Sequence, residues 1–463
     1  MLRRIALLGL ACVACDRGTT ATPDASTFTG RDGDLGATSA IIDHSGPNKG
    51  FAGPLAHGAV GATWQPIGCA GTVPVATGIT DAAWGETPVG ATDPSPHAVH
   101  TSFRFDTASS FAAVWETDAD TKASFVAYGD SPSKLDHFVQ GVTFTSPTQP
   151  YDRLDYPLAV HEAHVCGLSP NHTYYFAVGG DGYWGKVYSV TTAPPAGGDG
   201  GFRFVAMGDS NFFYDLYAQV QNAAGTYGPA FTLFTGDMVH DGLSQVDWEK
   251  WFTAGGSLLA TVPTMTAHGN HEAMATAYFA LFALPGEEEI YAFDYGNVHF
   301  VVLNDTPTTD ADIAGRQATF LDQDLTAAEA RPTPPRWIVT CHHRPMFSSD
   351  PDQGSFLNVR GAWQPILEKH HVDVDFNGHS HHYESTYSLL GDGGIVDGGG
   401  IRYITTGGAG ALFDPQTPTV NPWSMVYYAG LSLAIVDVTA HTFTIQGKKV
   451  DGTALEAPIV LTK

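Results

Sequence analysis

Three histidines lie within four positions of the stretch NGHSHHYES, residues 377–385. In an extended chain alternate side chains point the same way, so His379 and His381 can face one site while His382 points elsewhere. Neutral imidazole is the commonest metal ligand among protein side chains. The spacing therefore predicts His379 and His381 as ligands, and it assigns His382 to packing or hydrogen bonding.

Polar side chains also follow four other apolar runs of strand length. They are Asp209 after FVAM, Asp237 and His240 after FTLFT, Asn270, His271 and Glu272 after VPTMTA, and His342 and His343 after WIVTC. In layered α/β folds, sites form in the loops at the carboxyl ends of strands. Carboxylates combined with neutral imidazoles suit Zn, Mn or Fe rather than calcium. The order D…D…N…H…H-x-H therefore predicts a metal site.

The segment that carries these residues alternates strand and helix patterns. Apolar runs at 204–207, 231–234 and 337–340 have the length of strands, and residues 317–325 have a helical pattern. Residues 291–294 and 298–302 flank Tyr295-Gly296-Asn297 as the arms of a hairpin. We predict an α/β layered domain of mixed strand direction over residues 200–463.

Residues 76–195 have a different pattern. Short alternating runs lie at 102–105, 113–116, 124–128, 173–178 and 186–190, with turn residues between them. This pattern is typical of a β-sandwich of immunoglobulin or fibronectin type. Catalytic residue types do not cluster there, so we expect a scaffold or a role in substrate access. The stretch TTAPP followed by GGDGG predicts the domain boundary.

The first residues have the features of an export signal. A basic pair, Arg3-Arg4, precedes an apolar stretch at 5–14 that is too short for a permanent membrane span. Residues 1–15 are therefore expected to be a signal peptide, and Cys15 is a candidate for a lipidated N-terminus or simply lies at a cleavage site. We expect a secreted or periplasmic protein, touching membrane only through such an anchor. Residues 16–75 are predicted to be an irregular tether.

Three further cysteines leave alternatives open. In an oxidising compartment Cys69 and Cys166 could form a disulfide, or both could be small buried side chains. Cys341 has no evident mate.

The charge of the chain restricts its partners. Asp and Glu number 48 against 22 Lys and Arg, a net charge of −26. Such an acidic surface disfavours nucleic acid and anionic membranes. An anionic substrate would then need its positive charge from another source, and bound metal ions can supply it.

The motifs GDSN, GDMVH, GNHE, HRP and GHSH with the trailing HYE resemble those of the calcineurin-like metallophosphoesterase superfamily. The similarity is closest to its purple acid phosphatase branch. The stretches LSPNHTYYFAVGG, YAFDYGNVHFVVLND and YITTGGAGA extend it over roughly residues 76–460. The resemblance implies a fibronectin III-like all-β sandwich joined to a four-layer α/β domain, in which helices flank two mixed sheets.

The resemblance also implies two metals bridged by Asp237. The first metal would take Asp209, Asp237, His240 and His381, and the second would take Asp237, Asn270, His343 and His379. The family pattern of ligand-x-Pro selects His343 over His342, since Pro345 follows it by two positions. His271 matches a position that contacts phosphate and protonates the leaving oxygen, with Glu272 to orient it.

Two features depart from the purple enzymes. His240 stands where those enzymes carry a metal-bound tyrosine, and MFSSDPDQGSF lacks a further histidine that they have in this segment. Asn211 stands where many other relatives place a ligand histidine. Because an amide is a poorer ligand, we expect His240 to serve the first metal.

These observations predict an exported, binuclear phosphatase for small phosphate monoesters, which uses two divalent ions (Zn, Mn or Fe) to activate a hydroxide for attack. A phosphodiesterase acting on nucleotides or phospholipid headgroups is the alternative within the same class. Outside it, the alternative is a cell-surface binding protein with a vestigial metal site, against which the retained ligand set argues. The sequence does not indicate the oligomeric state.

Overall fold

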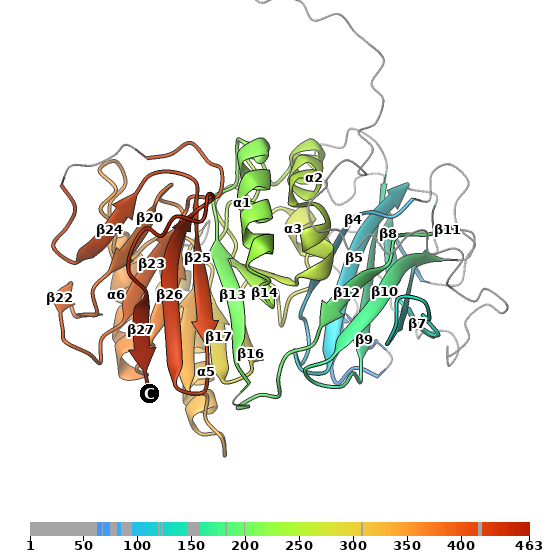
Figure 1. Cartoon of the computed structure of the whole chain (residues 1–463), viewed down its shortest axis with the longest axis horizontal. Helices are drawn as coiled ribbons and strands as arrows, with labels where there is room; N and C mark the ends of the chain where they lie inside the picture. The colour runs from blue at the N-terminus through green and yellow to red at the C-terminus, as the bar shows by residue number, and fades with distance from the viewer. Residues whose placement is uncertain are drawn as a thin grey trace, which may run out of the picture.

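The computed structural model describes residues 63–66, 68–74, 81–84, 95–118, 121, 124–145, 158–180, 183–198, 200–306, 309–414 and 419–463. The predicted signal peptide, Cys15 and most of the predicted tether lie outside these residues. The described chain forms an N-terminal β-sandwich beside a larger α/β domain (Figure 1). Within this described part, no helix is long and apolar enough to cross a membrane.

The sandwich consists of two antiparallel sheets. One has the strand order β3-β8-β9-β5-β4, and the other has the order β11-β10-β6-β7 with β12 paired to β10. The strands are β3 (Asp81–Trp84), β4 (His97–Ser102), β5 (Ser110–Asp118), β6 (Phe125–Gly129), β7 (His137–Gln140), β8 (Val142–Thr145), β9 (Leu158–Cys166), β10 (Thr173–Gly180), β11 (Tyr183–Trp184) and β12 (Tyr188–Thr191). The predicted β-sandwich is confirmed.

One predicted strand is displaced. The alternating run at 102–105 suggested a strand, but β4 ends at Ser102. Arg104 instead leaves the sheet and donates hydrogen bonds to Glu288 and to the carbonyl of Gly286 in the other domain. The alternation therefore reflects burial at the domain interface rather than sheet pairing.

A short ordered segment lies within the predicted tether. Strands β1 (Thr63–Trp64) and β2 (Val73–Pro74) pair with each other. A disulfide joins Cys69, between these strands, to Cys166 at the end of β9. Cys341 is a free, buried cysteine. The disulfide anchors the segment against the sandwich. Residues 16–75 show no periodic pattern, so the sequence did not predict this segment.

The α/β domain contains two mixed sheets. Their orders are β15-β14-β13-β25-β26-β27 and β16-β17-β18-β19-β23-β20-β24, and a separate hairpin pairs β21 with β22. The strands are β13 (Phe202–Met207), β14 (Phe231–Phe234), β15 (Thr264–Thr266), β16 (Tyr291–Tyr295), β17 (Val298–Val302), β18 (Trp337–Cys341), β19 (Val374–Asn377), β20 (Tyr383–Thr386), β21 (Leu389–Leu390), β22 (Gly394–Ile395), β23 (Arg402–Thr406), β24 (Ser424–Tyr428), β25 (Ser432–Val438), β26 (Thr442–Lys449) and β27 (Ile459–Thr462). The predicted strands and the β16–β17 hairpin are confirmed.

Helices cover the outer faces of both sheets. They are α1 (Tyr214–Thr226), α2 (Gln245–Thr261), α3 (Thr276–Leu281), α4 (Asp310–Asp312), α5 (Ala318–Glu329), which a π-helical turn at Ile313–Gln317 precedes, and α6 (Leu357–Lys369). The helix predicted at 317–325 corresponds to α5.

Three apolar interfaces separate the four layers. Phe231 on β14 packs against Phe300 of the facing sheet, whereas Phe234 on the same strand contacts Trp251 of α2. In β18, Val339 belongs to the core between the sheets and Ile338 to the core beneath α5 and α6. Strands that are buried on both faces explain why these runs are continuously apolar rather than alternating.

Candidate metal centre

The predicted ligands lie at the carboxyl ends of parallel strands in both sheets. Asp209 follows β13, Asp237 follows β14 and His343 follows β18, while His379 and His381 lie between β19 and β20. Because the two sheets pack face to face with these ends at the same edge, residues 170 positions apart in the chain meet there.

The backbone is left-handed at three of these loops. The φ angles are 62° at Asp209, 53° at Asp237 and 65° at His379. Such angles are uncommon for residues other than glycine and concentrate at functional sites. The glycine before each one allows close packing: a Cβ on Gly236 would lie 2.6 Å from Nδ1 of His343, and one on Gly378 would lie 2.4 Å from Oδ2 of Asp209. The loops are thus built around the ligand side chains.

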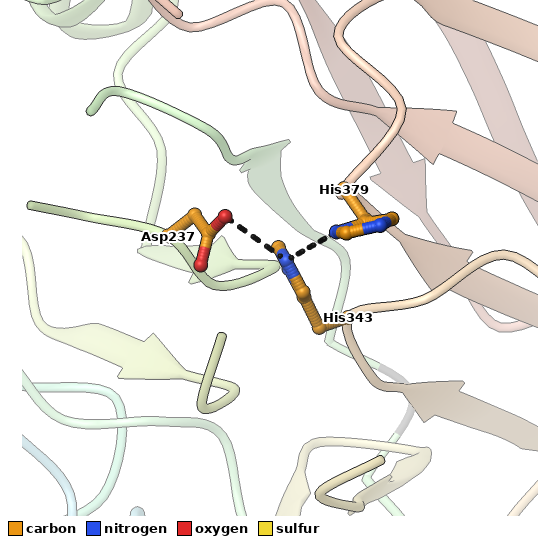
Figure 2. Close-up of side chains that lie close together, drawn as sticks. All are labelled: Asp237, His343 and His379. Atoms are coloured by element: carbon orange, nitrogen blue, oxygen red, sulfur yellow. Dashed lines mark hydrogen bonds and ion pairs between the residues drawn. The ribbon is translucent and has the colours of Figure 1, made fainter. Parts of the chain in front are cut away.

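Asp237, His343 and His379 point toward one another (Figure 2). Nε2 of His343 lies 3.2 Å from Oδ2 of Asp237 and 3.2 Å from Nδ1 of His379. One ligand atom from each residue lies within 4.8 Å of the other two. A metal about 2.1 Å from each atom requires this kind of convergence.

Asp209 and His381 form a second group beside the first. Nε2 of His381 lies 3.6 Å from Oδ1 of Asp209. The Asp209 carboxylate also accepts the backbone N–H of His379 at 2.9 Å. Asp209 and His381 thus lie beside each other, and the division of the ligands between two metals stays a prediction.

Hydrogen bonds orient two of the imidazoles. Nδ1 of His343 donates to the carbonyl of Thr235 at 2.8 Å, and Nδ1 of His381 donates to the carbonyl of Leu412 at 2.6 Å. Each ring therefore keeps Nε2 as the free atom and turns it toward a carboxylate. A backbone carbonyl commonly fixes the tautomer of a metal-binding histidine in this way.

The pKa values of the residues at the centre indicate that it favours a bound positive charge. Burial alone would lower the pKa of His343, but Asp237 raises it to about 10. Burial would raise the pKa of Asp237, yet the His343 cation brings it well below its usual range. Burial and the same cation lower the pKa of His379 to about 3. Ligands bind metal in their deprotonated forms, so a metal here would take the place of the His343 proton.

Two asparagine side chains border the group. Oδ1 of Asn270 is buried and has no hydrogen-bond partner among the described residues, and neither has either amide atom of Asn211. Buried polar atoms without partners are rare in folded proteins. Together with the carboxylate and imidazole donors, the orphan oxygen of Asn270 fits a bound metal. Its assignment to the second metal stays a prediction.

His271 lies at the mouth of the centre. Its Nε2 is 3.9 Å from Oδ2 of Asp237, and its Nδ1 donates to the carbonyl of His240 at 2.6 Å. Its backbone N–H donates to Oδ1 of Asp237 at 2.8 Å. The ring is partly exposed and reaches the space beside the predicted bridging carboxylate.

Glu272 has a different environment from the one expected. Its buried carboxylate accepts the backbone N–H groups of Asp237 at 2.9 Å, Met238 at 2.8 Å and Gly269 at 2.7 Å. Burial raises its pKa to about 7. Glu272 therefore holds together the two loops that carry Asp237 and Asn270, and its effect on His271 runs through the backbone.

His240 lies at the rim of the centre. Its ring is 4.2 Å from that of Phe212 and 5.2 Å from that of His271, measured between centroids, and the residue is exposed. Its backbone N–H donates to the hydroxyl of Tyr214. Coordination of the first metal by His240 stays a prediction.

The two histidines excluded as ligands are buried and hydrogen bonded. His342 lies between Asp305 at 2.7 Å and Asp375 at 3.0 Å. His382 lies between Asp414 at 2.9 Å and Glu384 at 3.1 Å. The prediction that His382 makes hydrogen bonds is confirmed, and His342 supports the loop that carries His343.

The sequence reasoning missed two residues near the centre. Asp305, shortly after β17, binds His342 and also accepts the backbone N–H of Arg344 at 2.8 Å. Its position after an apolar strand matches that of the other site residues and could have identified it. Phe356 packs edge-on against His379 at 5.0 Å. It lies in a loop with no pattern, so no local signal marked it.

Comparison with known families agrees with this architecture. Residues 96–192 match the "Purple acid Phosphatase, N-terminal domain" family, and residues 202–383 match the "Calcineurin-like phosphoesterase" family.

Curated relatives include plant and bacterial proteins. Purple acid phosphatase 18 of Arabidopsis thaliana is 26% identical over 332 residues, which cover 68% of this chain and 71% of the relative. "Uncharacterized protein Rv2577" of Mycobacterium tuberculosis is 27% identical over 279 residues, or 50% of this chain and 51% of the relative. The match to the mycobacterial relative thus spans about half of its length.

Solved structures show the same fold. The purple acid phosphatase PPD1 from yellow lupin (Lupinus luteus) seeds superposes with a TM-score of 0.70 at 19% identity, covering 80% of this chain and 74% of the other. PhoD superposes with a TM-score of 0.57 at 12% identity, covering 79% and 89%. The domain that carries the site matches the calcineurin-like phosphoesterase family. The chain thus joins a domain of the purple acid phosphatase N-terminal type to a calcineurin-like phosphoesterase domain.

Proposed function

We propose that this protein hydrolyses small phosphate monoesters with two divalent metal ions. The observation that carries the proposal is the convergence of Asp237, His343 and His379 on one point, with Asp209 and His381 beside them. The proposed ligands are Asp209, Asp237, His240 and His381 for one ion, and Asp237, Asn270, His343 and His379 for the other. Zn, Mn and Fe suit these donors.

When bound, the two ions would supply an activated water and neutralise the phosphate oxygens. Positive charge for this purpose is otherwise scarce in a chain with a net charge of −26. Asp237, which lies with His343 and His379, is the residue that we propose as a ligand of both ions. Thr235 and Leu412 hold His343 and His381 in the orientation that ligation needs.

His271 is proposed as the acid for the leaving group. With Nδ1–H committed to the carbonyl of His240, the outward atom is Nε2. A proton held there can pass to the leaving oxygen of an ester bound beside Asp237. Glu272 keeps His271 in place by fixing the loop that begins at Gly269.

We also propose that the protein is exported. The disulfide between Cys69 and Cys166 supports an oxidising compartment. The leader at residues 1–15, with or without lipidation of Cys15, is the proposed route.

The test is the activity of metal-loaded protein on p-nitrophenyl phosphate and on the bis-nitrophenyl ester. We expect the monoester to be the better substrate, whereas a preference for the diester would favour a phosphodiesterase.

Asp237→Asn removes the proposed shared ligand and should lower both bound metal and turnover, the latter by at least about a hundredfold. Asp451→Asn, in an exposed turn after β26, is the matched control. Normal turnover with two bound metals in Asp237→Asn would contradict the assignment.

A further inference from the structure

Two phenylalanines stand exposed beside the metal centre. Phe212 and Phe213 lie in the loop between β13 and α1 and are 43% and 46% exposed. Their ring centroids are 6.5 Å apart. The loop begins with Asp209, so these rings are only a few residues from a proposed ligand. A folded protein gains nothing in stability by leaving two such rings in water.

The backbone holds Phe212 in an unfavourable conformation. Its φ angle is 89°, in a region that bulky side chains rarely occupy. The loop is fixed on both sides: Ser210 and Asn211 donate to the carbonyl of Asp237, and Leu216 and Tyr217 donate to that of Phe213. A strained residue that the surrounding structure enforces is a candidate for function.

The rings continue directly outward from the catalytic groups. The Phe212 ring lies 5.8 Å from that of His271, nearly edge-on, and 4.2 Å from that of His240. His271 itself lies beside Asp237. An ester whose phosphate is bound at Asp237 and whose leaving oxygen faces His271 can therefore place its alcohol portion against Phe212.

We propose that Phe212 and Phe213 form an aromatic rim that selects phosphate monoesters of aromatic alcohols. This inference rests on the proposed phosphatase function. A flat aromatic leaving group would pack on the exposed rings and gain contacts that a hydrophilic one cannot make. In the reaction, water adds to phosphorus and gives up one proton to solvent, the bond from phosphorus to the alcohol oxygen breaks, and that oxygen takes a proton from His271, which solvent then restores. The products are the aromatic alcohol and inorganic phosphate.

The test compares benzyl phosphate with glycerol 1-phosphate, two esters of primary alcohols. The ratio of their kcat/KM values is measured in the metal-loaded wild type and in Phe212→Asn. Asparagine tolerates the left-handed backbone but removes the ring. We expect the ratio to fall about tenfold in Phe212→Asn. Phe212→Tyr, which keeps a ring, should retain it, as should Ile395→Asn, a control at an exposed apolar residue of β22.

Binding gives a second readout that does not depend on turnover. Calorimetry with benzylphosphonate and methylphosphonate should show a preference for the benzyl compound that Phe212→Asn loses. Phe213→Ala repeats the comparison at a residue whose φ of −118° is ordinary, in case the first variant does not fold. Unchanged ratios and affinities in both variants would overturn the aromatic rim alone. If the wild type neither hydrolyses the esters nor binds the phosphonates, the proposed function fails and this inference fails with it.

Discussion

At the scale of single residues, the centre depends on which atom of each side chain is left free. His343 and His381 each commit Nδ1 to a backbone carbonyl and direct Nε2 to a carboxylate. His342, next to His343, uses both nitrogens on buried carboxylates and has none left for a metal. Adjacent histidines therefore have different roles because of their partners.

This difference predicts opposite effects for two alanine substitutions. His343→Ala should lose most of the bound metal. His342→Ala should retain much more metal but lower the free energy of unfolding by about 3–5 kcal/mol, because it leaves Asp305 and Asp375 buried without their cation. Metal analysis and urea unfolding of both variants check this. Greater metal loss in His342→Ala would mean that the ligand-x-Pro pattern had been misread.

The histidine at position 240 leads to a prediction about the colour of the protein. The purple enzymes that this chain resembles have a tyrosinate on ferric iron at this position, whereas a neutral imidazole suits divalent ions. We expect the protein to be colourless and, loaded with ferric iron, to show no tyrosinate charge-transfer band in a visible scan. A strong band would contradict the role given to His240. Tyr214, whose hydroxyl accepts the His240 N–H, would then be the tyrosine to replace.

At the scale of elements, a histidine connects the β16–β17 hairpin to α5. His299 on β17 hydrogen bonds Asp294 across the hairpin and Asp324 on α5, each at 2.7 Å. Burial alone would lower the pKa of His299, but the two carboxylates raise it above its usual value. The charged imidazole thus helps to hold the helix against the sheet that carries His343.

The stability that His299 contributes should depend on pH. Its folded pKa is raised, so the contribution is complete below the unfolded pKa of about 6.5 and is lost as the pH rises through the folded value. His299→Gln should therefore lower the free energy of unfolding by about 2 kcal/mol at pH 6 and by less at pH 9. Urea unfolding of metal-free protein at both values measures this, with the exposed His137→Gln as control. An equal loss at both pH values would show that His299 is neutral throughout.

At the scale of the whole molecule, a buried interface joins the two domains. Arg104, next to β4, makes a 2.5 Å ion pair with Glu288 and also donates to the carbonyls of Leu284 and Gly286. Ser102 donates to the carbonyl of Ala283 at 2.7 Å. On the side of the α/β domain, the residues of this interface lie in the segment between α3 and β16. The sandwich therefore braces one wall of the α/β domain.

Removal of Arg104 should weaken this bracing. Arg104→Ala leaves Glu288 buried and unpaired and should lower the free energy of unfolding by about 3–5 kcal/mol. It should also speed limited proteolysis at the 194–201 linker. The double variant Arg104→Met/Glu288→Gln removes both charges and should recover part of the loss. A double variant as unstable as Arg104→Ala would assign the effect to packing rather than to the unpaired carboxylate.

The sequence by itself determined the elements and the candidate ligands. Strands such as β14 and β18 are buried on both faces, so they read as continuous apolar runs, and the polar residue after each run marked a strand end. Alternation along residues 379–382 predicted the separation of His382 from its neighbours, but the structure places these residues in bends between β19 and β20, with His379 left-handed, rather than in extended chain. Such patterns involve only neighbouring residues, so they can be read from the amino-acid sequence alone.

Only the tertiary structure decided which of these groups meet and how. Cys69 and Cys166 are 97 positions apart, and the placement of the β1–β2 hairpin beside the end of β9 brings them together. The contacts of Glu272 with two loops, and the packing of His240 on Phe212, depend on the relative placement of separate strand ends. The exposure of Phe212 likewise follows from how the surrounding loops pack. Contacts between distant segments leave no periodic trace in the sequence, so the structure alone reveals them.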